Sequence, residues 1–225
     1  MEPDEASSEP QEITNLKKRL KLSSKFNAFE MSYFDGSDDN GIISVGAKTG
    51  VVEYSMNYSF LQEDDSPRFI IEEIKFENPI HSQEMKLCIS ECKEKNDFQL
   101  LQMFMIEYSE LFQCRENILQ KLNEKYGTYF SNKHDIDKGY VIDLTISGKQ
   151  CLHANWTIEC KPHHNFQHKL DISEPESPSK RLQELCSKLC STDVQEYFHL
   201  QTVWMELMDC LVEEKMNQST FIHDL

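Results

Sequence analysis

Apolar residues recur every three or four positions between Asp97 and Tyr126, in a stretch that contains neither Gly nor Pro. Only Arg115 interrupts the row, which consists of Phe98, Leu101, Met105, Tyr108, Phe112, Leu119, Leu122 and Tyr126. This spacing predicts an α-helix over 97–126 with one long buried stripe, widened by Met103, Phe104, Ile106, Leu111 and Ile118. We expect Asn96 or Asp97 to cap its start and Gly127 to end it in a left-handed conformation.

Apolar and polar residues alternate on both sides of this helix, which is the pattern of half-buried β-strands. Before the helix, the alternation begins at Ile43 and Val45 and continues through 52–60 and 69–76. After the helix it runs through 140–146, 152–158 and 166–172. Short turns separate the segments, near Thr49-Gly50, over 62–67, at Gly148-Lys149 and at Lys161-Pro162. Each half is therefore predicted to form an antiparallel meander with one apolar face.

Helical periodicity also appears in three other segments, 82–95, 179–190 and 192–216. In the first of them the residues expected to face inward are Met85, Leu87, Cys88, Ile89 and Cys92. The order of elements predicts an α+β fold of two similar domains, each a three- to four-stranded antiparallel meander covered by helices, joined by the long central helix. We place the domains at 13–95 and 96–216, between a disordered acidic tail at 1–12 and a flexible tail at 217–225.

The charge of the chain limits its binding partners. The formal net charge is −16, from 39 acidic and 23 basic residues. Because phosphate binding needs a basic surface, we expect no nucleic-acid binding, whereas protein partners or basic tails suit this charge. The first residues hold no apolar run of signal-peptide type, and no stretch reaches about 18 consecutive apolar residues. We therefore expect an intracellular protein that does not enter membranes.

Two pairs of residues are candidates for partner binding. Residues 13–26 predict a short basic amphipathic helix, on which Leu16 and Leu20 are the best candidates. The alternative is that this helix simply packs on its domain with its charges in water. Phe198 and Trp204, on the last predicted helix, form the second pair. For both, burial in the core is the favoured alternative, because large aromatic side chains usually fill cores.

No catalytic, cofactor or metal site is predicted. The sequence contains no phosphate-binding glycine motif, nucleophile elbow or zinc-protease motif. A thiol of Cys151 or Cys160 beside His153 would be needed for a cysteine hydrolase, but His153 is expected on the outer face of its strand.

A zinc site is the other candidate that the sequence offers. Cys88 with Cys92, and Cys186 with Cys190, are each four residues apart on predicted helices, and His163, His164 or His168 could complete a site. We favour the alternative that these cysteines are small buried hydrophobic residues.

Several segments between Val51 and Ile172 carry a family resemblance. The first are VVEYSMNYSFL, FIIEEIKFENP and the charged ECKEKNDF, which leads into the long helix. That helix closes with Lys121-Leu122-Asn123-Glu124-Lys125-Tyr126, and ANWTIECK and HKLDIS follow as paired strands, with Trp156 in the aromatic position. In these segments the chain resembles the tandem RWD subunits of kinetochores. It departs from them in its N-terminal segment, because that family has a longer coiled coil than 13–26 can provide.

The resemblance implies a non-enzymatic subunit of the constitutive centromere-associated network, located in the nucleus at the centromere. It implies pairing with centromere protein O and entry into the complex with centromere proteins Q, U and R, without a small-molecule substrate or cofactor. A competing interpretation is an RWD-type adaptor of a ubiquitin or stress-kinase pathway, against which the second meander argues. A subunit of another kinetochore scaffold with paired RWD units is a third interpretation, and a cysteine hydrolase is a fourth.

Overall fold

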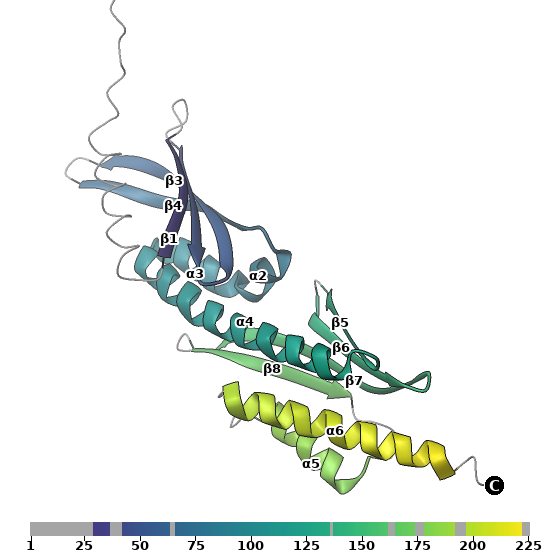
Figure 1. Cartoon of the computed structure of the whole chain (residues 1–225). Helices are drawn as coiled ribbons and strands as arrows, with labels where there is room; N and C mark the ends of the chain where they lie inside the picture. Colours follow the sequence, from purple (N-terminus) through teal and green to yellow (C-terminus); the bar gives the residue numbers. More distant parts are fainter. Residues whose placement is uncertain are drawn as a thin grey trace, which may run out of the picture. The chain divides into compact units, whose positions relative to one another are not determined.

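The computed structural model describes residues 29–36, 42–63, 66–135, 137–161, 165–173, 178–191 and 197–221. These residues form two four-stranded antiparallel sheets and five helices (Figure 1), which confirms the predicted α+β class. The expected tail at 1–12 and the basic segment 13–26 lie outside the described residues. No helix in the described part of the chain is long and apolar enough to cross a membrane.

The first sheet is a meander of four strands in sequential order: β1 (Phe29–Gly36), β2 (Ile42–Thr49), β3 (Val52–Glu63) and β4 (Ser66–Phe76). Strands β2, β3 and β4 were predicted, and β1 was not. The inner face of this sheet is apolar, with Val45, Ala47, Tyr54 and Met56 all buried. Gly50 has φ +56° in the turn between β2 and β3, a conformation that favours glycine.

The predicted helix 82–95 is instead two helices, α2 (Pro79–Glu84) and α3 (Lys86–Lys95), which are separated at Met85. Cys88 and Cys92, four residues apart, form the buried side of α3. Leu87 is 74% exposed, so its predicted inward position is wrong. The reason is helical geometry, because a residue next to Cys88 points about 100° away from it around the helix axis.

The predicted helix 97–126 is present as α4 (Phe98–Tyr126). Asp97 caps its start, since its carboxylate accepts a hydrogen bond from the backbone N–H of Leu100 at 2.9 Å. The predicted row is buried from Leu101 to Tyr126, but Met103 is 64% exposed and does not widen it. Gly127 does not have a positive φ, so the left-handed end predicted for this helix is wrong. The chain turns there by a bond of 2.8 Å from the N–H of Tyr129 to the carbonyl oxygen of Tyr126.

The second sheet is also a sequential meander, formed by β5 (Phe130–Asp135), β6 (Gly139–Ile146), β7 (Lys149–Lys161) and β8 (Asn165–Ser173). The sequence predicted three of these strands and missed β5. After Phe130, the next four residues of β5 are all exposed, so they leave no alternating pattern to detect. Ser147 and Gly148 both have positive φ, which makes the turn between β6 and β7 the tight type that matches the twist of a hairpin.

Two helices complete the chain, α5 (Lys180–Cys190) and α6 (Tyr197–Phe221). Ser179 caps α5, with its side chain accepting from the N–H of Leu182. Helix α6 continues to Phe221 and so enters the segment 217–225 that was expected to be a flexible tail. One apolar core joins α4, the second sheet, α5 and α6.

The chain divides into two compact units inside α4. The first unit ends at Ser109 and the second begins at Glu110, with Gln83–Met85 belonging to the second. From the sequence, the boundary between the two domains was placed after residue 95. The first turns of α4 belong with the first sheet because the ring centre of Phe98 lies 6.3 Å from that of Tyr58 and the N–H of Val51 donates to Ser109.

Candidate functional site

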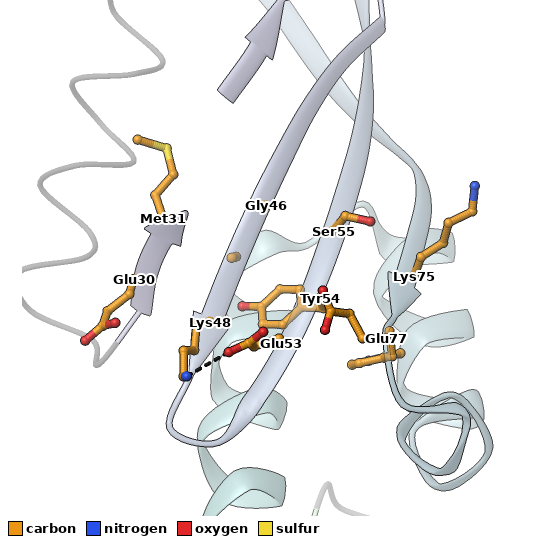
Figure 2. A pocket seen from close by; sticks show the side chains of 11 residues that line it. Glu30, Met31, Gly46, Lys48, Glu53, Tyr54, Ser55, Lys75 and Glu77 are labelled. Carbon is orange, nitrogen blue, oxygen red and sulfur yellow. Dashed lines mark hydrogen bonds and ion pairs between the residues drawn. The ribbon is translucent and has the colours of Figure 1, made fainter. Parts of the chain in front are cut away.

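A hollow of about 340 Å³ crosses all four strands of the first sheet (Figure 2). Five of its eleven lining residues are charged, and they come from β1, β2, β3, β4 and the residue that follows β4. The lining residues are Glu30, Met31, Gly46, Ala47, Lys48, Glu53, Tyr54, Ser55, Lys75, Phe76 and Glu77. The hollow is therefore lined by charged groups of both signs as well as by apolar side chains.

Strand register places the charged lining residues on one face of the sheet. Glu30 pairs with Lys48 and Lys48 with Glu53, so these three side chains form a row across β1, β2 and β3. Gly46, Ser55 and Lys75 form the neighbouring row, and two of these residues are small. We call this the outer face of the first sheet, because Tyr54 and Met56 point to the opposite, buried side.

The outer face carries an excess of negative charge. Among the side chains that the structure describes, the carboxylates on it or beside it are Glu30, Asp35, Glu53, Glu72, Glu73 and Glu77. Against these six stand two lysines, each already in an ion pair: Lys48 with Glu53 at 2.7 Å and Lys75 with Glu73 at 2.8 Å. The hydrogen bond that Lys48 donates to Glu53 and the charge of that carboxylate raise the pKa of Lys48. The six carboxylates exceed the two lysines by four, so these side chains carry four net negative charges.

The second unit contains a different charged group, which is buried. Arg115 on α4 holds the carboxylate of Glu84 through two bonds, Nη1 to Oε1 at 2.6 Å and Nη2 to Oε2 at 3.0 Å. The N–H of Ile158 donates to the same carboxylate at 2.9 Å, and the guanidinium lies 4.6 Å from the ring centre of Tyr140. The sequence marked Arg115 as an interruption of the apolar row, but it gave no sign of Glu84 as its partner.

His168 and Trp156 form a neutral buried pair in the second sheet. The indole N–H of Trp156 donates to Nδ1 of His168 at 3.2 Å, with the ring centres 5.4 Å apart. Burial lowers the pKa of His168 to about 3, and the positive charge of Arg115 acts in the same direction. Burial also raises the pKa of Tyr140, with the neighbouring carboxylate of Glu116 adding to the effect. His168 is only 3% exposed, so its imidazole lies inside the core and not on the surface.

The closing motif of α4 holds helix α6. Lys125 Nζ lies 2.8 and 2.9 Å from the two carboxylate oxygens of Asp209, and the hydroxyl of Tyr126 donates to Oδ1 at 2.7 Å. Lys121 Nζ donates to Gln201 at 2.8 Å. Burial tends to raise the pKa of Asp209, but the hydrogen bonds from Lys125 and Tyr126 outweigh it and lower the pKa overall. The motif therefore fixes α6 along the end of α4.

The four candidate partner-binding residues have different outcomes. Leu16 and Leu20 lie outside the described residues, as does the side chain of Phe198. Trp204 is fully buried, and its ring stacks on Trp156 with centres 5.6 Å apart and an interplanar angle of 27°. Trp204 thus fills the core, which is the alternative that the sequence favoured, and does not offer a surface for a partner.

The cysteine and histidine candidates do not come together as a reactive pair. The thiol of Cys151 belongs to the apolar core and donates to the carbonyl oxygen of Lys149 at 3.3 Å. His153 lies on the opposite face of β7, where its Nδ1 is 2.7 Å from the carboxylate of Asp143. Among the described residues, no group of three or more His, Cys, Asp or Glu side chains is arranged to hold a metal ion. His163 and His164 lie outside those residues.

A comparison with protein-family models and a comparison with curated proteins found no match to this chain.

Proposed function

We propose that this chain is a non-enzymatic structural subunit of the inner kinetochore, whose two units are tandem RWD-like domains joined by α4. The observation that carries the proposal is the repeated order of elements. Each unit contains four antiparallel strands in sequential order, and helices follow the strands in both. On the sequence segments between Val51 and Ile172, we propose centromere protein P as the member of the family that the chain resembles.

The closing motif of α4 supports the same proposal. Lys121, Lys125 and Tyr126 are among the residues on which the resemblance rests, and all three contact α6. A motif that orients two helices of one domain has a physical reason to recur in proteins that share the domain. The motif therefore fits a structural role better than a chemical one.

The proposed partner is centromere protein O, in the nuclear complex that also holds centromere proteins Q, U and R. Each sheet has two edge strands, β1 and β4 in the first and β5 and β8 in the second. Edge strands present backbone N–H and C=O groups that another chain can cover. Leu87 and Met103 add exposed apolar surface in the first unit. We expect a heterodimer interface of about 2,000 Å² or more, the size of obligate complexes.

Co-purification with centromere protein O tests this proposal. The chain alone should self-associate or melt over a broad range, and the mixture should form a one-to-one complex that melts at a higher temperature. Sedimentation velocity and circular dichroism measure the two properties. A monomeric chain that melts cooperatively and is unchanged by centromere protein O would contradict the proposal.

The adaptor interpretation predicts different partners. An affinity purification from mitotic cells should recover the other subunits of the centromere-associated network. Recovery of ubiquitin-pathway enzymes or a stress kinase in their place would favour the RWD-type adaptor.

A further inference from the structure

In the described part of the chain, three of the four strands at the sheet edges are covered or irregular. In the first sheet, the N–H of Ile71 on the edge strand β4 donates to the side chain of Asn96 at 2.9 Å. In the second sheet, the backbone of Ile172 on the edge strand β8 is hydrogen-bonded to the thiol of Cys190. Strand β1 has a register shift in its pairing with β2, and a bulge of this kind protects an edge from further pairing. The remaining edge strand is β5.

Strand β5 pairs with β6 in a regular register, which identifies its outward backbone groups. The N–H of Thr145 donates to the carbonyl oxygen of Tyr129 at 2.8 Å, so these two residues form a hydrogen-bonded pair. Along an antiparallel ladder such pairs occur at every second residue. The backbone groups of Lys133 therefore point to β6, and those of Asn132 and His134 point away from the sheet.

The side chains of β5 gain little from pairing with β6 alone. After Phe130, four consecutive residues are exposed, so both faces of the strand meet solvent. Lys133 and Asp135 lie on one face, and the residues opposite them on β6 are Val141 and Gly139, which carry no charge. A strand that buries no side chains must offset its loss of conformational entropy with ladder hydrogen bonds alone. A second strand at the free edge would add such bonds and bring partners to both charges.

A second copy of this chain fits the edge poorly. Antiparallel pairing of β5 with itself must align the outward backbone groups, which allows only registers that differ by two residues. The register with Lys133 opposite Asp135 pairs only residues 133–135, because β5 ends there. The next register opposes Lys133 with Lys133 of the other copy, and like charges directly opposite are destabilising. The one after that opposes Lys133 with Ser131 and gives neither charge a partner. A strand from a different chain is therefore favoured.

We propose that the free edge of β5 pairs antiparallel with an extended strand of the partner subunit, which places an acidic side chain opposite Lys133 and a basic one opposite Asp135. In sequence, that strand carries a lysine or arginine two residues before an aspartate or glutamate. The inference rests on the proposed function, because it locates one part of the interface with centromere protein O. In strand addition of this kind the main chain supplies affinity and the side chains supply specificity.

Asn132→Pro tests the pairing of the backbone. The N–H that it removes points away from β6, so no bond within the sheet is lost, and proline is tolerated at such edge positions. Fluorescence anisotropy of labelled centromere protein O with the full chain measures the dissociation constant. Asn132→Pro should weaken the complex at least about ten-fold, whereas Asn132→Ala, which keeps the N–H, should stay within about two-fold of the unmodified chain. The circular dichroism spectrum should be the same for both variants.

Lys133→Glu tests the charge stated for the partner strand. It opposes two acidic side chains and should weaken the complex at least about three-fold. The matched control is Lys138→Glu, which reverses the charge of an exposed lysine in the turn after β5 and should stay within about two-fold. Equal effects of the two substitutions would mean that only net charge is sensed, and would overturn the chemistry proposed for the partner strand.

Amide hydrogen exchange measures the pairing without any substitution. In the chain alone, the amides of Asn132 and His134 should exchange quickly and that of Lys133 slowly. In the complex the first two should exchange at least about ten-fold more slowly than in the chain alone. Slow exchange of both in the chain alone would mean that another segment of the same chain covers the edge, which would overturn the proposal.

Failure of this inference and failure of the proposed function give different results. A complex that forms equally well with Asn132→Pro, and in which the amides of Asn132 and His134 still exchange quickly, would overturn the assignment to β5 and leave the heterodimer in place. The absence of any complex with the unmodified chain would contradict the proposed function and this inference with it.

Discussion

Arg115 and Glu84 form a two-bond ion pair from which solvent is excluded, with side chains 0% and 2% exposed. The pair joins α4 to the end of α2, and the N–H of Ile158 brings β7 to the same carboxylate. Phe112 and Tyr140 cover the guanidinium, with ring centres 5.1 and 4.6 Å from its central carbon. Three segments that are distant in sequence thus depend on one buried pair of charges.

Arg115→Met is predicted to destabilise the second unit by about 3–5 kcal/mol, because it leaves the Glu84 carboxylate buried without its counter-charge. The measurement is urea unfolding followed by tryptophan fluorescence. The two tryptophans of the chain, Trp156 and Trp204, both lie in the core of this unit and so report on it alone.

Two variants control this prediction. Arg115→Met/Glu84→Met removes both charges and should recover most of the lost stability, since an apolar replacement of a buried pair is often nearly neutral. Lys169→Met removes an exposed partner of Glu159 and should cost less than about 1 kcal/mol. A cost for Arg115→Met as small as that for Lys169→Met would show that the buried pair is not important for stability.

Local signals explain what the sequence predicts well. Helix 97–126 follows from one periodic row of residues, and its cap is Asp97, one of the two neighbouring polar residues that the sequence offered. Of the two strands that were missed, β1 and β5, the second has almost no buried side chains and therefore no pattern. The break at Met85 was missed because each of the two short helices continues the apolar spacing of the other.

The candidate site could not be predicted, because it depends on contacts between distant residues. The hollow exists only once the register places Gly46 beside Ser55 and Glu30 beside Lys48. Sequence alternation identifies which residues share a face of one strand, but it does not give the pairing between strands. The overall excess of acidic residues was visible in the sequence, whereas the face on which part of it lies was not.

His168 is predicted to make the second unit less stable as the pH falls below about 6.5. Burial and the charge of Arg115 lower its pKa to about 3 in the fold, from an ordinary value of 6.5. The unfolded chain therefore takes up a proton at a higher pH than the folded chain, and stability decreases between these two values. Between these values the free energy of unfolding should change by up to about 1.4 kcal/mol per pH unit. Urea unfolding with tryptophan fluorescence at a series of pH values measures this slope.

The control for this prediction is the slope in variants that lack one histidine. His168→Gln keeps an acceptor for the indole N–H of Trp156 and does not titrate, so its stability should depend less on pH. His199→Gln changes an exposed histidine of α6 and should leave the slope as it is. If His168→Gln has the slope of the unmodified chain, the imidazole is not held neutral in the fold.

Gly50→Ala is predicted to destabilise the first unit more than Gly148→Ala destabilises the second. Both glycines have positive φ, which costs an alanine about 1–2 kcal/mol. A Cβ on Gly50 would also lie 2.2 Å from the hydroxyl oxygen of Ser109, whereas a Cβ on Gly148 meets nothing within 4 Å. Hydrogen exchange, resolved for the two hairpins, measures both effects in one protein.

Removing the hydroxyl tests the cause of that difference. In a chain that already carries Ser109→Ala, the change Gly50→Ala should cost less stability than it costs in the unmodified chain. Only the strain of positive φ then remains. If Gly50→Ala and Gly148→Ala reduce the hydrogen-exchange protection of their hairpins equally, the contact with Ser109 relaxes without cost.

Tyr126→Phe is predicted to weaken the attachment of α6 to α4 by about 1 kcal/mol. The change removes the hydrogen bond from the Tyr126 hydroxyl to Asp209 at 2.7 Å, while the ring stays in the core and Asp209 keeps its ion pair with Lys125. Burial raises the pKa of Tyr126 to about 12, so the hydroxyl remains a donor throughout the neutral range. Urea unfolding with tryptophan fluorescence measures the loss.

Tyr129→Phe, at a tyrosine packed against the same core, should change stability by less than about 0.5 kcal/mol. A loss for Tyr126→Phe no larger than that would mean that the motif holds α6 through the ring alone, because the hydroxyl would then contribute no net stability.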